Sequence, residues 1–158
     1  MNGRIVAVCM APAKGMQKTD VGEAILVEDK GMEGDGHFGF QHRQVSLLNA
    51  EEAAKIREKV PGLKAGDFAE NLLVEGFDLA RLGVGDRIQV GAALLEVTQM
   101  GKECHSRCAI YEAAGDCIMP RLGVFCRVIR GGTVRSGDEL KIENYSGLHN
   151  REHEKNNA

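Results

Sequence analysis

Two cysteines spaced four residues apart, Cys104 and Cys108, form the segment of this sequence best suited to chemistry. They follow a predicted strand, and residues at positions i and i+4 fall on the same face of a helix. Lys102, His105 and Arg107 supply positive charge beside them. Positive neighbours lower the pKa of a thiol and keep a thiolate available, which is the form that attacks sulfur or binds a soft metal. We therefore expect Cys104 and Cys108 to be the reactive centre.

Three interpretations of this cysteine cluster stay open from its residues alone. The first is a set of buried, inert thiols, although the polar neighbours make full burial unfavourable. The second is a structural zinc site formed by Cys104, Cys108 and Cys117 with His105, although no second close pair of cysteines follows. The third, which the charged surroundings favour, is a reactive thiolate that carries sulfur or binds a soft metal centre.

A glycine-rich stretch from Gly34 to Arg43 carries a second set of polar side chains. Its composition is typical of a loop over a site, in which Arg43 holds an anionic group and His37 acts as an acid, a base or a ligand. A solvated loop with incidental histidines is the alternative. Further along the chain, Glu70 and Asn71 precede a predicted strand, where they either line the mouth of a pocket or form a plain turn.

Short strands separated by glycines must position these side chains, because the chain has 20 glycines and little regular alternation of strands with helices. One helix is predicted after Asn49, with Glu51 and Glu52 in its first turn and Pro61 and Gly62 at its end. The fold class predicted is mainly β, a closed or nearly closed barrel with few short helices. The predicted strands are Arg4–Met10, Glu23–Val27, Gln44–Leu48, Asn71–Val74, Arg87–Val90, Ala93–Thr98, Val124–Ile129 and Glu139–Ile142.

Composition limits the classes of function. A length of 158 residues fits one domain, predicted over residues 1–145, and the polar stretch 146–158 is expected to be a disordered tail. A net charge of -3, 4% aromatic residues and no tryptophan argue against nucleic acid or a membrane surface as a partner. The apolar run near the N-terminus is too short to span a membrane or act as a signal peptide, so we expect a cytoplasmic protein with reduced cysteines. Cys9, in that run, is expected to be a small buried hydrophobe.

Taken in order, these segments resemble a MOSC domain, the module named after the C-terminal part of molybdenum cofactor sulfurases. The likeness extends over residues 4–143 and rests on motifs in a fixed order, each of them short. They are a glycine-Asp-His loop and strand, a Glu-Asn segment, a cysteine region, and a segment typical of the stand-alone bacterial subgroup. In this chain they correspond to Glu33–His37 with Arg43–Leu48, Phe68–Leu72, Cys104–Cys108 and Ile118–Phe125.

The resemblance implies a β-barrel-like fold and a role around the molybdenum cofactor (molybdopterin). Family members are proposed to carry sulfur as a cysteine persulfide for delivery to a metal–sulfur or molybdenum cofactor centre. Enzyme relatives hold molybdenum through a cysteine in a Cys-Ser-Arg-Cys context, and by that likeness Cys108 carries the sulfur or binds the metal, with Cys104 as a second thiol. The side chains then expected to bind the cofactor or the anionic sulfur are His37, Arg43, Asn71, Lys102 and Arg127.

Three hypotheses of function follow from the resemblance and the residues. The first is a MOSC domain that binds molybdenum cofactor or carries sulfur on Cys108; pyridoxal phosphate then belongs to its partner. That partner is a cysteine desulfurase or an enzyme that makes or uses the molybdenum cofactor. The second is a small molybdenum-dependent oxidoreductase that reduces N-hydroxylated compounds with electrons from a partner reductase. The third is a non-catalytic binding module stabilised by zinc, so the sequence leaves open whether the protein is an enzyme.

Overall fold

The computed structural model of the chain describes residues 2–13, 16–39, 43–101 and 122–144. Strands dominate these residues, with one α-helix, α1 (Ala50–Lys59), and one 3₁₀ turn, η1 (Leu79–Arg81). The predicted mainly β class is confirmed. The strands are β1 (Gly3–Met10), β2 (Thr19–Asp20), β3 (Glu23–Val27), β4 (Gly31–Met32), β5 (Val45–Asn49), β6 (Leu72–Glu75), β7 (Arg87–Val90), β8 (Ala93–Met100), β9 (Val124–Arg130), β10 (Gly132–Arg135) and β11 (Glu139–Asn144).

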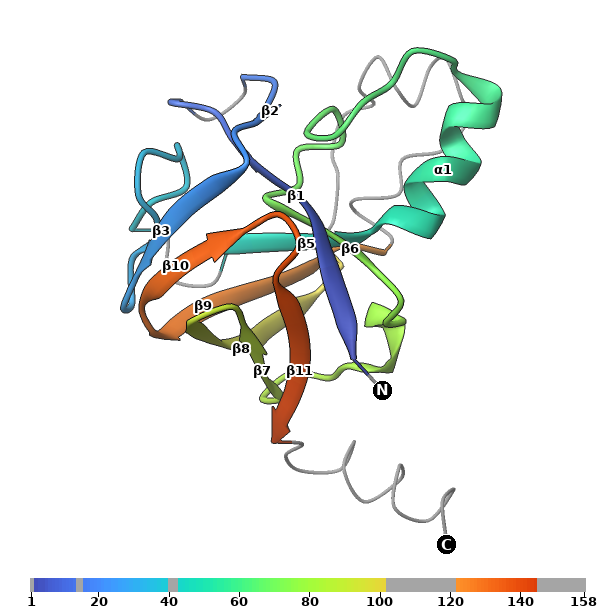
Figure 1. Cartoon of the computed structure of the whole chain (residues 1–158). Helices are drawn as coiled ribbons and strands as arrows, with labels where there is room; N and C mark the ends of the chain where they lie inside the picture. Colours follow the sequence, from blue (N-terminus) through green and yellow to red (C-terminus); the bar gives the residue numbers. More distant parts are fainter. Residues whose placement is uncertain (1, 14–15, 40–42, 102–121, 145–158) are drawn as a thin grey trace, which may run out of the picture.

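Seven strands close into a barrel, in the order β11-β7-β8-β9-β5-β6-β1 (Figure 1). The pairing of β1 with β11, through Gly3 opposite Leu140, closes the ring. All neighbours are antiparallel except β5 and β6, which run parallel. Closure leaves no unpaired sheet edge among these strands, which removes the usual template for aggregation. A smaller sheet of β10, β3 and β4 lies beside the barrel, and β2 extends β1.

Two apolar clusters fill the fold because side chains alternate along each strand. The first fills the barrel; β9, for example, directs Val124, Cys126 and Val128 into it. The second lies between the outer face of the barrel and α1, which buries Ala53 and Ile56 there. The outward-facing residues of β1, β5 and β6 therefore pack against the helix, which covers this part of the outer face of the barrel.

The helix begins after Asn49, as predicted, but the Asn49 side chain does not cap it. Its amide instead donates to the carbonyl oxygens of Val74, at 3.2 Å, and Phe77, at 2.7 Å, and accepts the Leu79 N–H at 2.9 Å. Val74 lies in β6, the strand next to β5, and Phe77 and Leu79 follow that strand, so Asn49 forms hydrogen bonds with a segment that sequence alone does not bring near it. The acidic first turn still favours the positive end of the helix dipole.

Two segments that the sequence predictions concern lie outside the residues that the structure describes. The proposed disordered tail, residues 146–158, lies outside the described residues, as does most of the connection from β8 to β9. In the part of the chain that is described, no helix is long and apolar enough to cross a membrane.

Candidate functional site

The cysteine segment connects the end of β8 to the start of β9, and its two ends are held together. The Gly101 N–H donates to the Gly123 carbonyl at 2.7 Å, and the Gln99 amide donates to the Gly101 carbonyl at 2.7 Å. The described ends of the segment, at Gly101 and Gly123, therefore lie side by side. The predicted residues that lie outside the described part of the chain are Lys102, Cys104 and Cys108, together with Cys117.

The two cysteines that the structure describes, Cys9 and Cys126, are both fully buried, which confirms the prediction for Cys9. Burial raises the pKa of the Cys9 thiol to about 12, and the charge of Glu70 adds to this effect. Burial likewise raises the pKa of Cys126. A thiol with a raised pKa is a poor nucleophile and a poor metal ligand at neutral pH, so these two cysteines serve packing.

Asn71 joins three neighbouring strands beside the barrel rim. Its side-chain oxygen accepts the Ser46 N–H at 2.9 Å, and its side-chain nitrogen donates to the Cys9 carbonyl at 3.0 Å. The side chain therefore bridges β5 and β1 at the point where β6 begins. Ser46 in turn pairs with Phe125 of β9, two residues beyond Gly123. Asn71 is thus linked, through Ser46 of β5, to the part of β9 that directly follows the cysteine segment.

Glu70 is fully buried and organises the turn before β6. Its carboxylate accepts the N–H groups of Gly66, at 3.0 Å, and Phe68, at 3.2 Å. Burial raises the pKa of Glu70, and these hydrogen bonds oppose the rise in part. Gly66 has φ of +92°, and any side chain there would collide with the Lys18 carbonyl, so the turn packs directly on the segment before β2.

Lys18, Asp35 and His37 form a compact charged cluster at the same end of the fold. The Lys18 ammonium lies 2.8 Å from Asp35 Oδ1 and 3.4 Å from His37 Nδ1. His37 Nδ1 also lies 3.5 Å from Asp35 Oδ2. The side chains of Lys18 and Asp35 are 3% and 0% exposed, whereas that of His37 is 33% exposed. His37 is therefore the member of the cluster that reaches solvent.

Asp35 stays ionised in spite of its burial. Burial by itself raises the pKa of this carboxyl, but hydrogen bonds from His37 and Lys18, the Lys18 charge and the Ala11 N–H lower it well below its ordinary value. The Ala11 N–H lies 3.2 Å from Oδ1 and the His37 N–H lies 3.1 Å from Oδ2. Because Ala11 follows β1, the carboxylate ties the end of that strand to the loop after β4.

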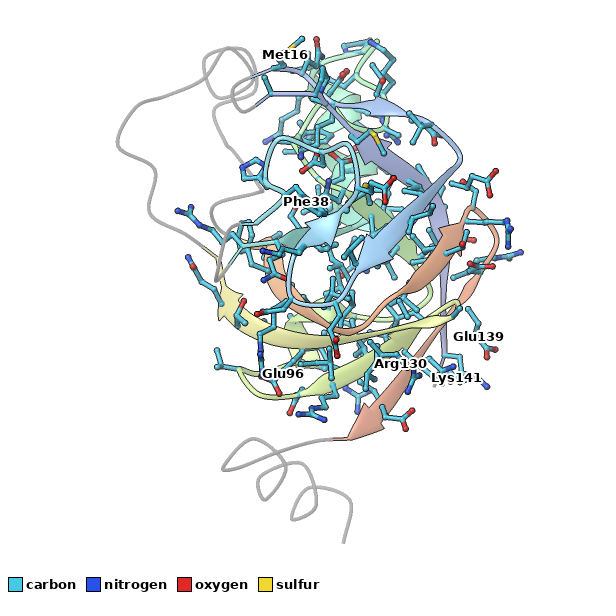
Figure 2. All side chains as sticks on the ribbon, turned by 90° about the vertical axis from the view of Figure 1, so that its left-hand side faces the viewer. Met16, Phe38, Glu96, Arg130, Glu139 and Lys141 are labelled. Atoms are coloured by element: carbon cyan, nitrogen blue, oxygen red, sulfur yellow. The ribbon has the colours of Figure 1, made fainter. Side chains whose placement is uncertain are left out.

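The other predicted cofactor-binding residues lie in two different places. Arg43 is exposed and lies just before β5 in the chain. Arg127 lies on β9 between residues that face the core, so it points outward, and it pairs with Glu96 at 3.2 Å. Glu96 also pairs with Arg87 at 3.1 Å. Figure 2 shows Glu96 on the barrel wall, apart from the loop that carries Phe38.

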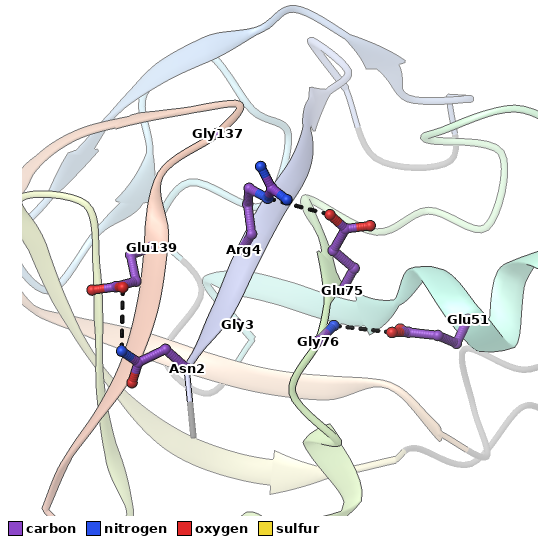
Figure 3. Close-up of a pocket in the computed structure, with 8 residues that line it drawn as sticks. All are labelled: Asn2, Gly3, Arg4, Glu51, Glu75, Gly76, Gly137 and Glu139. Atoms are coloured by element: carbon purple, nitrogen blue, oxygen red, sulfur yellow. Dashed lines mark hydrogen bonds and ion pairs between the residues drawn. The ribbon is translucent and has the colours of Figure 1, made fainter.

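A hollow of about 570 Å³ lies at another position, where β1, β6 and β11 begin or end (Figure 3). Each carboxylate drawn there has a partner. Glu75 pairs with Arg4 at 3.3 Å, Glu51 accepts the Gly76 N–H at 2.9 Å, and Glu139 accepts from the Asn2 amide at 3.2 Å. Among the predicted site residues that the structure describes, His37, Arg43, Asn71 and Arg127 do not line this hollow.

Sequence reasoning missed Lys18 as part of the site and treated Asp35 only as part of a motif. Asp35 had a local signal, since it stands between two glycines and two positions before His37. Lys18 had none, because it lies 17 residues from Asp35, next to a strand of two residues.

The glycine-Asp-His loop and the cysteine segment occur together in a known family. The sequence model of the MOSC domain matches residues 33–141, more than half of the chain. The chain belongs to the MOSC domain family. The matched stretch begins just before Asp35 and includes the Glu70 and Asn71 turn and the cysteine segment. A comparison with curated proteins finds no match.

Solved structures show the same fold as this MOSC domain. The YUAD protein from Bacillus subtilis superposes with a TM-score of 0.77 at 23% identity, over 92% of this chain and 98% of that one. YiiM from Geobacillus stearothermophilus gives 0.67 at 19% identity, over 90% of this chain and 75% of that one. YiiM from Escherichia coli gives 0.64 at 22% identity, over 93% and 72%. At these identities the likeness concerns the fold.

Proposed function

We propose that this MOSC domain binds molybdenum cofactor, or carries sulfur as a persulfide on Cys108, for delivery to a molybdenum cofactor or metal–sulfur centre. The observation that carries the proposal is the family match, which covers the His37 loop and the cysteine segment together. The described residues add support, because Cys9 and Cys126 are packed inert thiols and the sulfur chemistry is left to the segment that holds Cys104 and Cys108.

A continuous line of contacts supports one site across four strands. It runs from Phe125 on β9 to Ser46 on β5, through Asn71 before β6 to Cys9 on β1. Two residues beyond Cys9, the Ala11 N–H binds Asp35. Neighbouring strands lie about 4.8 Å apart, so the three spacings place the ends of this line about 15 Å apart. The line therefore connects the strand that follows the cysteine segment with the strand whose end binds the His37 loop through Asp35.

The residues fit an anionic ligand. Arg43 is exposed and always charged, and His37 is held by Lys18 and Asp35 at the solvent boundary. These two side chains would bind the phosphate of the pterin or the negative charge on sulfur, with Cys108 as the thiolate that holds the metal or the sulfur. When bound, the cofactor supplies a redox-active molybdenum centre. Among the residues that the structure describes, no group of three or more His, Cys, Asp or Glu side chains could hold a metal ion.

Sulfur loading requires no added oxidant. The Cys108 thiolate attacks the outer sulfur of a persulfide on the partner desulfurase; the S–S bond of the donor breaks, the donor leaves as a thiolate, and a new S–S bond forms on Cys108. The pyridoxal phosphate that first abstracts sulfur from cysteine belongs to that partner. The Cys104 thiolate then attacks the outer sulfur of this persulfide; the S–S bond to Cys108 breaks, Cys108 leaves as a thiolate, and Cys104 carries the sulfur to the acceptor.

Mass spectrometry of the full chain, after incubation with a cysteine desulfurase and cysteine, tests the sulfur-carrier function. We expect a gain of about 32 Da, one sulfur atom, on Cys108. Cys108→Ser abolishes it, and Cys9 and Cys126 stay unmodified in the same sample because they are buried. A wild-type chain that gains no sulfur on Cys104 or Cys108 and also purifies without molybdopterin contradicts the proposal.

The reductase alternative differs in metal content. Protein made in a host that synthesises the cofactor would then contain molybdenum, lose it in Cys108→Ser, and reduce N-hydroxylated compounds when a partner reductase supplies electrons. A sulfur carrier purified from the same host contains sulfur on Cys108 without stoichiometric molybdenum. Metal analysis and the fluorescence of oxidised molybdopterin distinguish the two.

A further inference from the structure

The Glu70 turn, residues 64–70, is held from inside by a buried carboxylate. The two oxygens of Glu70 accept the N–H groups of Gly66 and Phe68. Ala69 has φ of +69°, a left-handed conformation that residues other than glycine seldom adopt, and its N–H donates to the Gly66 carbonyl at 3.0 Å. Strained backbone of this kind persists only where the surrounding contacts define it. The turn is therefore a fixed element of the fold.

This turn packs on the main chain that leads into β2. At Gly66 an added Cβ would collide with the Lys18 carbonyl and lie 3.1 Å from the Thr19 nitrogen. The Gln17 side-chain amide donates to Asp67 of the same turn. The Glu70 turn thus contacts three successive residues of this segment, and Lys18 is the middle one.

Lys18 connects the Glu70 turn to the glycine-rich loop. Its side chain is 3% exposed, and its ammonium lies 2.8 Å from Asp35 Oδ1. The same carboxylate oxygen accepts the Ala11 N–H, and the Gly36 N–H donates to the Ala11 carbonyl at 2.8 Å. Each charge of a buried pair has lost its hydration and depends on its partner. A shift of the Lys18 main chain therefore disturbs Asp35 and the loop that Asp35 holds against the end of β1.

We propose that Gly66 and Glu70 are positioning residues of the MOSC site, which act through Lys18 by holding its main chain where the ammonium reaches Asp35. Neither residue contacts a ligand in this scheme, because Glu70 is completely buried and Gly66 has no side chain. The proposal gives the Glu-Asn segment an indirect role, as the support of the glycine-Asp-His loop. The consequence for binding rests on the function proposed above.

Two glycines of this chain provide a matched pair of variants. Gly66 and Gly62 have nearly equal φ, +92° and +96°, so an alanine strains the backbone to a similar degree at both positions. A Cβ added at Gly62 has no atom within 4 Å, whereas one added at Gly66 meets the Lys18 carbonyl. Gly62→Ala therefore measures the strain alone, and Gly66→Ala adds the displacement of Lys18.

The Lys18 ammonium reports its own position by NMR. In the full chain labelled with ¹⁵N-lysine, exposed ammonium groups exchange protons with water too fast to be seen at neutral pH, whereas a buried, paired one is protected. Lys18→Arg keeps the charge and identifies the signal by removing it. We expect a protected signal in the wild type and in Gly62→Ala, and at least about tenfold faster exchange in Gly66→Ala. An unprotected ammonium in the wild type, or unchanged protection in Gly66→Ala, overturns the proposal.

Glu70→Gln tests the second residue, and it does so even if Gly66→Ala fails to fold. The amide replaces one of two acceptor oxygens with a donor, so either Gly66 or Phe68 loses the partner of its N–H. The matched control is Asp86→Asn, because Asp86 is also completely buried and accepts the Gly83 N–H at 2.8 Å in the turn before β7. We expect faster exchange of the Lys18 ammonium in Glu70→Gln only. Equal exchange in the two variants overturns the role of Glu70, since both exchange a buried carboxylate for an amide.

Sulfur loading measures the consequence separately. We expect the initial rate of persulfide formation on Cys108, or the affinity for molybdopterin, to fall about tenfold in Gly66→Ala, because small displacements of a binding loop are costly. Gly62→Ala stays within about twofold of the wild type. An unchanged rate in a Gly66→Ala chain with a displaced ammonium overturns the consequence for binding. If the wild type neither loads sulfur nor holds cofactor, the proposed function fails, and the ammonium measurements still decide whether Gly66 and Glu70 position Lys18.

Discussion

Two clusters in this barrel have the same composition, a carboxylate between two basic side chains, and differ in their surroundings. Asp35 lies between Lys18 and His37, with separations of 2.8 Å and 3.5 Å. Glu96 lies between two arginines on the outer wall, Arg87 at 3.1 Å and Arg127 at 3.2 Å. The Glu96 side chain is 20% exposed, and its partners are 40% and 39% exposed, whereas Asp35 is completely buried.

The difference shows that distance alone does not decide what an ion pair does. On the outer wall, water and salt screen the attraction between Glu96 and the arginines, and the side chains pay entropy to stay in place. In the buried cluster, Asp35 has few alternatives to its partners, so its position is defined closely. The outer cluster suits solubility and the choice of strand partners; the inner one suits the orientation of His37.

The largest effect is expected from Asp35→Asn. The change leaves the Lys18 charge buried without its counter-ion, and loss of one partner of a buried pair costs about 3–5 kcal/mol of folding free energy. Urea unfolding at neutral pH measures it. The matched variant, Glu96→Gln, is expected to cost less than about 1 kcal/mol. Equal losses in the two variants would contradict the contrast between the clusters.

The next largest effect is expected in the dependence of the unfolding free energy on acid pH, through Asp35. The pKa of Asp35 is lowered in the folded chain, so below its ordinary value of about 4 the unfolded chain binds more protons than the folded one. The contribution of Asp35 is therefore complete above that pH and is lost as the pH falls, by about 2–3 kcal/mol. When the pH is lowered from about 7 to about 2, the free energy of unfolding should fall less steeply in Asp35→Asn than in the wild type.

Glu70 should change the pH dependence of stability in the opposite direction to Asp35. Burial raises its pKa, so the folded chain binds more protons than the unfolded one above its ordinary value of about 4.3. Its contribution is present at low pH and is lost as the pH rises through the raised pKa. In Glu70→Gln the measured stability should decline less, or not at all, as pH increases over this window. A decline equal to that of the wild type would contradict a buried, protonatable Glu70.

The smallest effect is expected on the outer wall. A double-mutant cycle of Glu96→Gln and Arg127→Gln should give a coupling free energy of about 0.5 kcal/mol, within the range of exposed pairs. In about 1 M salt, where charges are screened within about 3 Å, the coupling should almost vanish. A coupling well above 1 kcal/mol that survives salt (about the upper limit for exposed pairs) would mean that Glu96 is buried more effectively than its exposure indicates.

The sequence by itself determined most of the strands that the structure describes and the helix α1. Arg87–Val90 and Glu23–Val27 were predicted with the observed bounds, and Ala93–Thr98 was two residues short. Alternation of polar and apolar residues is a local property, since neighbouring side chains on a strand point to opposite faces. The burial of Cys9 and the outward direction of Arg127 follow from the same rule.

Only the tertiary structure decided which distant residues meet. The sequence suggested the loop of His37 and, separately, the cysteine segment, but Lys18 joined the cluster because β2 pairs with β1 and the turn at Gly66 packs against the segment before β2. Asn49 was expected to cap a helix and instead binds residues 25 to 30 positions away. Contacts of this kind depend on the register of strands around a closed barrel. Local preferences set each strand, whereas closure through β1 and β11 sets which strands are neighbours.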